Sequence, residues 1–147
     1  MTKLLIAFFL VSFSFTLPVW KTNLPKAKEE AKQSNKLILL NFSGSDWCGP
    51  CIRLRKEIFG SDAFQNYAAE NLVLVNADFP RMKKNQLPKD QTKQNEALAE
   101  KYNKTGKFPF TVLIDADGNV LKQWDGLPKE TPDEFVSDIK SIAHASH

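Results

Sequence analysis

The chain contains two cysteines, and they lie close together. Cys48 and Cys51 occur in the stretch SGSDWCGPCIRLRK, residues 43–56, and are separated by Gly49 and Pro50. Cysteines at this spacing can supply half of a zinc site, close a small structural disulfide, or form a dithiol that exchanges disulfides with other proteins. A structural disulfide that closes so short a ring removes little chain entropy, so this interpretation is the weakest of the three.

A zinc site is the main alternative to disulfide exchange. A closed structural zinc site takes four protein ligands, and His144 and His147 are the only histidines that could complete a set with the two cysteines. Both histidines lie at the extreme C-terminus, where chain ends fray by default, and Pro50 is unusual between two metal-ligating cysteines. We therefore expect neither a metal nor another cofactor.

Disulfide exchange is favoured by the position of the motif between two predicted elements. Leu37–Leu40 is an apolar run typical of a buried strand, and residues 51–59 have the apolar spacing of a helix. A helix N-terminus carries unpaired N–H groups and about half a positive charge. A thiolate at this point is stabilised, so its pKa falls below the free value of about 8.5 and it can attack a disulfide.

The two cysteines are predicted to have different roles. Cys48 precedes the helix, so we expect it to be exposed and to attack the substrate disulfide. Cys51 shares an apolar helix face with Leu54 and Ile58, so we expect it to be the resolving thiol, which attacks the mixed disulfide and releases the substrate.

The residues around the cysteines are expected to shape the site. Gly49 allows a tight turn, Pro50 has no N–H to leave unpaired in the first helical turn, and Trp47 can cover one side. We interpret Asp46 as a solvated loop residue rather than a proton acceptor for Cys48. A basic loop is interpreted as a solvated face rather than a docking surface; it contains Arg81, Lys83, Lys84, Lys89 and Lys93.

The remaining sequence predicts one three-layer α/β domain with a mixed sheet of about four strands. Strands separated by helices favour parallel pairing, and the turn at Asp117-Gly118 joins the last two strands in an antiparallel hairpin. Gly60 and Ser61 mark the end of one helix and the start of the next, and Pro80–Thr92 is a long loop insertion. Helices are expected over residues 24–36, 51–59, 61–68, 94–104 and 131–143, and strands over residues 37–43, 71–79, 110–115 and 119–124.

The N-terminal residues have the pattern of a secretory signal peptide. Lys3 is followed by a run without charge from Leu4 to Trp20, which is shorter and richer in serine and threonine than a typical membrane span. We assign residues 1–16 to the signal peptide and residues 20–147 to the folded domain, and we expect a periplasmic or secreted protein. An uncut N-terminal membrane anchor is the alternative.

The composition is that of one globular domain without an unusual charge. Of the 147 residues, 42% are apolar and 25% are charged, which suffices for one core. Removal of residues 1–16 takes away one of 20 basic residues, leaving 19 against 17 acidic ones. This near balance gives no reason to expect a nucleic acid or a membrane surface as partner, and we expect a monomer.

The motif WCGPC, Trp47–Cys51, resembles the active-site motif of thioredoxins residue for residue. Phe108-Pro109 directly precedes the third predicted strand, where this family has a cis-proline that faces the dithiol and helps to hold the substrate chain. The resemblance extends from Trp20 to about Ala143. The stretches VNADFPRMKK, NEALAEKY and DADG are similar to exported bacterial thioredoxin-like proteins that reduce or isomerise disulfides.

The resemblance implies a thioredoxin-like fold and a thiol–disulfide oxidoreductase that reduces or isomerises protein disulfides. Its partners would be proteins that carry disulfides, together with a membrane-bound or other thiol electron donor. A non-catalytic partner-binding or assembly protein with the same fold is the alternative. The catalytic residues would be Cys48 and Cys51, and the residues that shape the site would be Trp47, Gly49, Pro50, Phe108 and Pro109.

Four positions depart from the family pattern. Asn41, if one inserted residue is allowed, replaces a buried aspartate thought to help deprotonate the resolving thiol, and Leu74 replaces a lysine on the next strand. Phe110 stands for the usual threonine after the cis-proline, and Phe108 is bulkier than the usual residue before it. These changes leave the dithiol intact and bear on the rate and the substrate preference.

Overall fold

The computed structural model describes residues 16–145, so the expected signal peptide at residues 1–16 lies outside it except for its last residue. Among the described residues, no helix is long and apolar enough to cross a membrane. In chain order the elements are β1 (Trp20–Lys21), α1 (Leu24–Ser34), β2 (Leu37–Ser43), α2 (Gly49–Arg53), η1 (Leu54–Phe59), α3 (Asp62–Asn71), β3 (Leu72–Asp78), η2 (Lys83–Asn85), α4 (Lys89–Tyr102), β4 (Phe110–Ile114), β5 (Val120–Asp125) and α5 (Pro132–Ala145).

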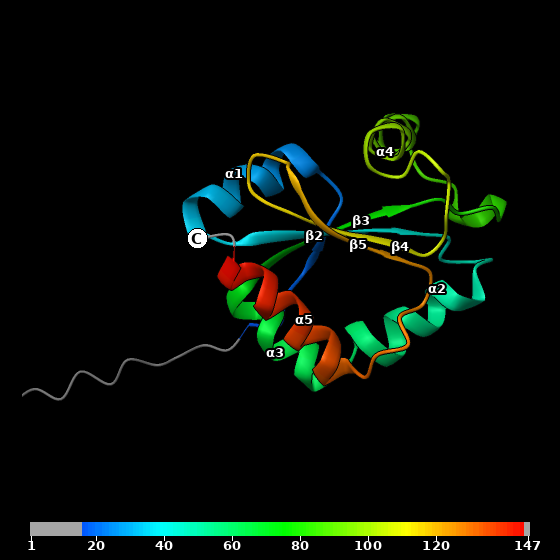
Figure 1. Cartoon of the computed structure of the whole chain (residues 1–147). Helices are drawn as coiled ribbons and strands as arrows, with labels where there is room; N and C mark the ends of the chain where they lie inside the picture. The colour runs from blue at the N-terminus through cyan, green and yellow to red at the C-terminus, as the bar shows by residue number, and fades with distance from the viewer. Residues whose placement is uncertain (1–15, 146–147) are drawn as a thin grey trace, which may run out of the picture.

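The strands form one mixed sheet in the order β1-β3-β2-β4-β5 (Figure 1). β1 and β2 are parallel to β3, whereas β4 is antiparallel to both β2 and β5. This confirms the predicted α/β sandwich with an antiparallel hairpin at one edge. The sheet has five strands rather than about four, because β1, in which Trp20 pairs with Leu74, has only two residues and shows no periodicity in the sequence.

The direction of β4 differs from the sequence prediction. The helix between β3 and β4 predicted parallel pairing, but Phe110 at the start of β4 lies opposite Phe42 near the end of β2. Figure 1 shows α4 nearly end-on, across the strands rather than alongside them. α4 does not carry the chain back to the end of the sheet where β2 and β3 begin. β4 therefore starts at the end of the sheet where β2 and β3 stop, and it runs antiparallel to β2.

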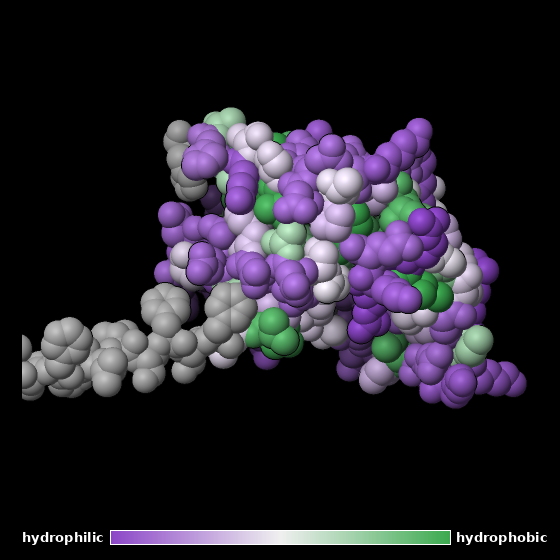
Figure 2. Space-filling model, turned by 90° about the horizontal axis from the view of Figure 1, so that it is seen from below, coloured by the Kyte–Doolittle hydropathy of each residue, from purple (hydrophilic) through white to green (hydrophobic). Residues whose placement is uncertain are grey.

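Two apolar layers enclose the sheet because strand side chains alternate between its faces. Ile38 and Leu40 of β2 belong to the core beneath α1 and α4, whereas Leu39 belongs to the core beneath α3, α5 and η1 (Figure 1). The outer surface of the second layer, seen from below in Figure 2, is mostly hydrophilic with scattered apolar residues.

Gly60 and Ser61 separate the helix that follows the cysteine motif from α3. The helix after the cysteine motif ends in η1, a π-helix, whose i→i+5 bonding brings Leu54, Ile58 and Phe59 into the core. Gly60 follows it with a φ of −86°, so it is not a left-handed cap. Glycine is required there because a Cβ would lie 2.8 Å from the carbonyl oxygen of Lys56. The Ser61 hydroxyl then caps α3, as predicted.

The predicted loop at residues 80–92 is shorter than expected. A 3-10 turn, η2, lies within it, and α4 begins at Lys89, five residues before the predicted start at Gln94. The polar first turn of α4 has no apolar period, so the sequence pattern did not reveal it. Pro88 directly precedes the helix.

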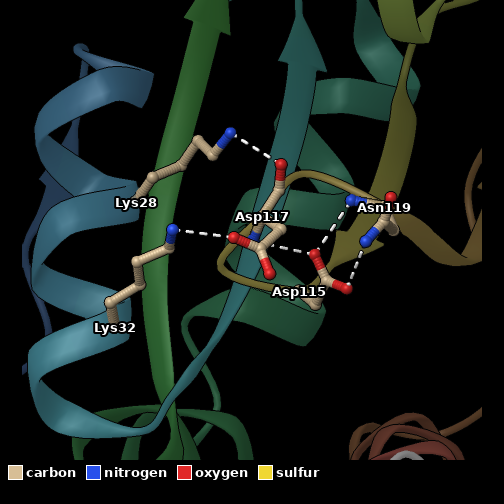
Figure 3. Close-up of polar contacts among 5 residues, drawn as sticks. All are labelled: Lys28, Lys32, Asp115, Asp117 and Asn119. Carbon is tan, nitrogen blue, oxygen red and sulfur yellow. Dashed lines mark hydrogen bonds and ion pairs between the residues drawn. The ribbon is translucent and has the colours of Figure 1, made fainter.

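The β4–β5 hairpin turn is tied to α1 (Figure 3). Asp115 accepts backbone N–H groups of Asp117 and Asn119 at 2.9 Å each. From α1, Lys28 donates to the Asp117 carbonyl at 2.7 Å, and Lys32 pairs with the Asp117 carboxylate at 2.7 Å. Burial disfavours the charged form of Asp115, but the hydrogen bonds from Asn119 and its neighbours outweigh it and lower the pKa of that carboxyl. The turn therefore anchors the sheet edge to the α1 layer.

Candidate active site

The two cysteines form a disulfide at the start of α2. Their Cα atoms are 5.2 Å apart. Cys48 is the N-cap of α2, in extended backbone conformation, and its sulfur accepts the Cys51 backbone N–H at 3.3 Å. Gly49 and Pro50 are exposed in the first helical turn. The motif therefore occupies the strand-to-helix junction that the sequence predicted, with an N–H donor directed at the first sulfur.

The expectation that Cys48 is exposed is wrong for this disulfide form. Cys48 retains 4% of its accessible surface and Cys51 retains 5%. The Cys48 sulfur is bonded to Cys51 and accepts that residue's N–H, so it turns toward the first turn of the helix rather than outward.

Trp47 is held beside the disulfide from several directions. Its indole N–H donates to the Phe79 carbonyl at 2.7 Å, and its ring meets the Phe108 ring edge-on, with 5.5 Å between centroids. Gly44 passes so close that a Cβ there would lie 2.2 Å from the indole ring. The Gly44 carbonyl also accepts the Cys48 N–H at 2.9 Å, so the same glycine positions both the indole ring and Cys48.

The Phe108–Pro109 peptide bond is cis, as the resemblance implied. The contact between Phe108 and Trp47 brings this segment to the cysteine motif across more than 50 residues of sequence. The buried side chain of Asn103 fixes the approach, because it bonds both the N–H and the C=O of Lys107 at 3.0 and 2.8 Å. The Pro109 carbonyl accepts the Gly126 N–H at 2.9 Å.

Asp46 lies in a solvent-exposed loop, as expected, and it also anchors the loop after β3. Its carboxylate accepts the backbone N–H groups of Arg81 and Met82 at 2.9 and 3.0 Å, and the Asn85 side chain at 3.0 Å. The Arg81 and Asn85 hydrogen bonds lower the pKa of this carboxyl. The Arg81 guanidinium lies over the Trp47 ring at 3.6 Å. One residue of the basic loop is therefore part of the site's wall.

A small cavity lies on the other side of Cys51, with a volume of about 70 Å³. Two of the four positions that depart from the thioredoxin pattern differ in their relation to this cavity: Asn41 lines it, whereas Leu74 is buried in the apolar core. The Asn41 side chain donates to Asn76 at 3.0 Å and accepts the Thr111 hydroxyl at 3.1 Å. The cavity is lined by Trp20, Asn41, Ser43, Ser45, Cys51, Ile52, Arg55, Phe59 and Asn76.

The structure brings together the predicted residues and adds several that the sequence analysis missed. Trp47, Cys48 and Cys51 lie within five consecutive residues, and the Trp47–Phe108 contact joins the cis-proline segment to them. Asn103 and Asp46 were missed as positioning residues because most of their partners are backbone groups, which leave no mark in a sequence pattern. Within residues 16–145, no group of three or more His, Cys, Asp or Glu side chains is placed to hold a metal, and His147 lies beyond that range.

Comparison with known proteins agrees with this arrangement. Residues 24–140 match the family described as thioredoxin-like domain. Disulfide bond reductase DsbH of Chlamydia pneumoniae is 38% identical over 131 residues, which cover 86% of this chain and 76% of that protein. Thioredoxin-related protein DsbJ of the same organism is 28% identical over 86% of this chain but only 36% of its own length.

A solved structure gives the same result for the fold. The structure of a DsbH oxidoreductase superposes with a TM-score of 0.79 at 34% identity, over 90% of this chain and 89% of that one. The site chemistry, the family match and these relatives agree on one point: the chain belongs to the thioredoxin-like family and is a thiol–disulfide oxidoreductase of the DsbH-like bacterial branch with a Cys48–Cys51 pair.

Proposed function

We propose that this protein reduces disulfides in exported protein substrates, with Cys48 as the nucleophile and Cys51 as the resolving thiol. The observation that carries the proposal is the Cys48–Cys51 disulfide at the N-terminus of α2, with Cys48 as the N-cap. The similarity to a curated disulfide bond reductase supports the same direction of reaction.

The reaction has two exchange steps. In the dithiol form, the Cys48 thiolate attacks one sulfur of the substrate disulfide, a mixed disulfide forms, and the other substrate sulfur leaves as a thiolate. The Cys51 thiolate then attacks the Cys48 sulfur, the intramolecular disulfide forms, and the second substrate thiolate leaves and takes up a proton. The substrate gains two electrons and the Cys48–Cys51 pair loses two.

The groups around the disulfide have distinct roles in this proposal. The helix N-terminus and the Cys51 N–H stabilise the Cys48 thiolate. Trp47 and Phe108 form an aromatic wall, and Pro109 offers backbone against which an extended substrate segment can lie. Gly49 and Pro50, exposed beside the disulfide, form the remaining side of the site.

A reductase of this kind needs a supply of electrons. The signal-like pattern of residues 1–16 supports export to an oxidising compartment, where the dithiol must be regenerated by a membrane-bound or other thiol donor. No metal or organic cofactor takes part in the proposed steps. We also propose a monomer, and the α3–α5 face seen in Figure 2 is mostly hydrophilic.

The proposal is tested by turnover of insulin disulfides with dithiothreitol as the electron donor. We expect the wild-type protein to accelerate precipitation of the released chain, and Cys48→Ser to give only the uncatalysed rate. A folded wild-type protein without catalysis would contradict the proposal and leave a partner-binding role. Reactivation of scrambled ribonuclease, measured in parallel, separates an isomerase from a reductase, because only isomerisation restores native pairing.

A further inference from the structure

One face of the sheet changes from apolar to polar as it approaches Cys51. β2 and β3 are parallel and in register, so Leu39 lies beside Leu74, and Asn41 lies beside Asn76. One further step along the same face, Ser43 lies beside Asp78 at the ends of both strands. A buried sheet face is normally apolar throughout, so polar pairs at its active-site end need a reason.

These polar side chains form a continuous hydrogen-bonded chain. The Ser43 hydroxyl lies within donating distance of two acceptors, Asn76 Oδ1 at 3.3 Å and Asp78 Oδ1 at 3.2 Å. Since a hydroxyl has a single proton, Ser43 can bond only one of them at a time. The Ser45 hydroxyl donates to Asp78 Oδ2 at 2.5 Å. The Asp78 carboxylate also accepts the Ser45 backbone N–H at 2.9 Å, so it is bonded to Ser45 and can in addition accept the Ser43 hydroxyl.

Both serines also line the cavity of about 70 Å³ beside Cys51, together with Asn41 and Asn76. A volume of this size is enough for more than one water molecule, and four polar side chains supply the partners that such waters need. Asp78 does not line the cavity itself. Asp78 is half-buried at the end of β3. The serines connect its carboxylate to the cavity, and the exposed part of the side chain faces solvent.

We propose that Asp78 is the proton acceptor for Cys51, acting through Ser43, Ser45 and water in this cavity. The inference rests on the proposed function, because only the resolving step requires Cys51 to lose its proton. Asn41 cannot take that proton, since an amide has no basic site at neutral pH, and Leu74 offers none. Asp78 is a carboxylate connected to the cavity by hydrogen bonds.

The proposed step is balanced as follows. The Cys51 S–H proton passes through water and a serine hydroxyl to the Asp78 carboxylate. The Cys51 thiolate attacks the Cys48 sulfur, the Cys48–Cys51 bond forms, and the bond from Cys48 to the substrate sulfur breaks. The substrate thiolate leaves with the electron pair, and Asp78 later returns its proton to solvent.

Other charged groups surround this chain of hydrogen bonds. Arg55 lines the cavity from η1 and favours a thiolate at Cys51 by its charge. Asp46 and Arg81 lie on the neighbouring loops and are engaged with the loop backbone and the Trp47 ring, respectively. From α4, the neutral side chain of Asn95 donates to the Asp78 backbone carbonyl at 2.8 Å.

The test separates the two exchange steps. The reduced protein is mixed with limiting dithiobis(nitrobenzoate), which releases one thionitrobenzoate when Cys48 attacks and a second when Cys51 resolves the mixed disulfide. We expect Asp78→Asn to leave the first release unchanged and to slow the second about tenfold to 100-fold at neutral pH, where 100-fold is the low end for a positioned general base. The difference should shrink above about pH 8.5, where a cysteine ionises without help.

Further variants distinguish a proton acceptor from a structural residue. Asp78→Glu should retain most of the second-step rate, and Ser45→Ala should slow that step alone. Asn41→Asp in the Asp78→Asn background should restore it, because it places a carboxylate at the cavity. Glu57→Gln, a carboxylate on η1 that pairs with Arg53, should change neither step.

The results that would overturn the role of Asp78 differ from the result that would overturn the proposed function. An unchanged second step in Asp78→Asn, a slowing that is equal at all pH values, or the same slowing in Glu57→Gln would each overturn the inference. A wild-type protein that releases neither thionitrobenzoate would instead overturn the proposed function.

Discussion

The Arg81 guanidinium lies 3.6 Å from the centre of the ring of Trp47, the residue that directly precedes Cys48 in the chain. This contact depends on Asp46, whose carboxylate binds the Arg81 and Met82 backbone N–H groups. A cation over an aromatic face is attracted by the ring's quadrupole. The loop after β3 is therefore tied to the loop that carries the cysteine motif by a carboxylate and an arginine.

The anchor at Asp46 should weaken at low pH. Because the folded-state pKa of this carboxyl is lowered by its hydrogen bonds, its stabilising effect is present above the unfolded value of about 3.9 and is lost as pH falls through the lower folded value. We expect the Trp47 indole N–H resonance to shift over this acid range in NMR spectra. The shift should be absent in Asp46→Asn and retained in Asp133→Asn, an exposed residue of α5. A wild-type resonance that does not move below pH 4 would contradict this account.

Gly44 should tolerate no larger side chain. A Cβ would lie 2.2 Å from the Trp47 ring, so we expect Gly44→Ala to displace the ring and to lower the free energy of unfolding by about 1–3 kcal/mol, as overpacking does. Insulin reduction should fall as well, because the same residue positions Cys48. Gly60→Ala is the matched control, since its Cβ would meet the Lys56 carbonyl oxygen instead. It should destabilise the protein while leaving the Trp47 resonance in place; the same displacement of Trp47 in both variants would argue against a local effect.

The sequence was sufficient for the elements whose signals are local. The helix expected over residues 131–143 is present, and a local signal explains its start: Thr131 and Glu134 form a capping box, with Thr131 N–H to Glu134 at 2.8 Å and Glu134 N–H to Thr131 at 3.3 Å. The hairpin at Asp117-Gly118 is present for a similar reason. The direction of β4 could not be predicted, because it depends on how α4 lies across the sheet and not on any residue within β4.

The site was predictable only where residue type and spacing carry the chemistry. The cysteine pair, the tryptophan before it and the cis-proline are recognisable from the sequence alone. The links among Ser43, Asn76 and Asp78 were not, because parallel strands bring together residues more than 30 positions apart. Register between strands is a tertiary property, and the pattern within one strand does not reveal which residue of another strand lies beside it.

The roles of the two thiols can be separated by trapping. We expect Cys48→Ser to abolish insulin reduction, and Cys51→Ser to attack substrates without releasing them, so that mixed disulfides accumulate. Non-reducing gels of the purified variants after incubation with oxidised insulin measure this directly. If Cys48→Ser accumulates the adducts and Cys51→Ser does not, the two roles are reversed.

Export can be tested independently of catalysis. A fusion of the first 20 residues to alkaline phosphatase should be active, because that reporter folds only after translocation, and a fusion without these residues should be inactive. N-terminal sequencing of the native protein should begin between about Phe15 and Lys21, the span that a short apolar region allows. A native protein that starts at Met1 and stays in the cytoplasm would contradict the assignment.

The last prediction concerns the redox potential. Gly49 and Pro50 place no charged or polar side chain beside the Cys48 sulfur, so the thiolate has only the helix N-terminus and backbone N–H groups to stabilise it. A less stabilised thiolate means a less stabilised dithiol form, and the reduced protein is then the better electron donor. Thioredoxin lies about 150 mV below a strong periplasmic oxidant, which corresponds to about 7 kcal/mol for two electrons. We expect equilibration with glutathione to give a potential on the thioredoxin side of that interval.

Pro50→His should raise the potential by on the order of 30 mV or more, because an imidazolium next to Cys48 stabilises the thiolate. Gly106→Ala, outside the motif, should leave the potential unchanged even if it lowers stability through its positive φ. A wild-type potential near that of the strong oxidant would mean that the protein forms disulfides rather than reducing them.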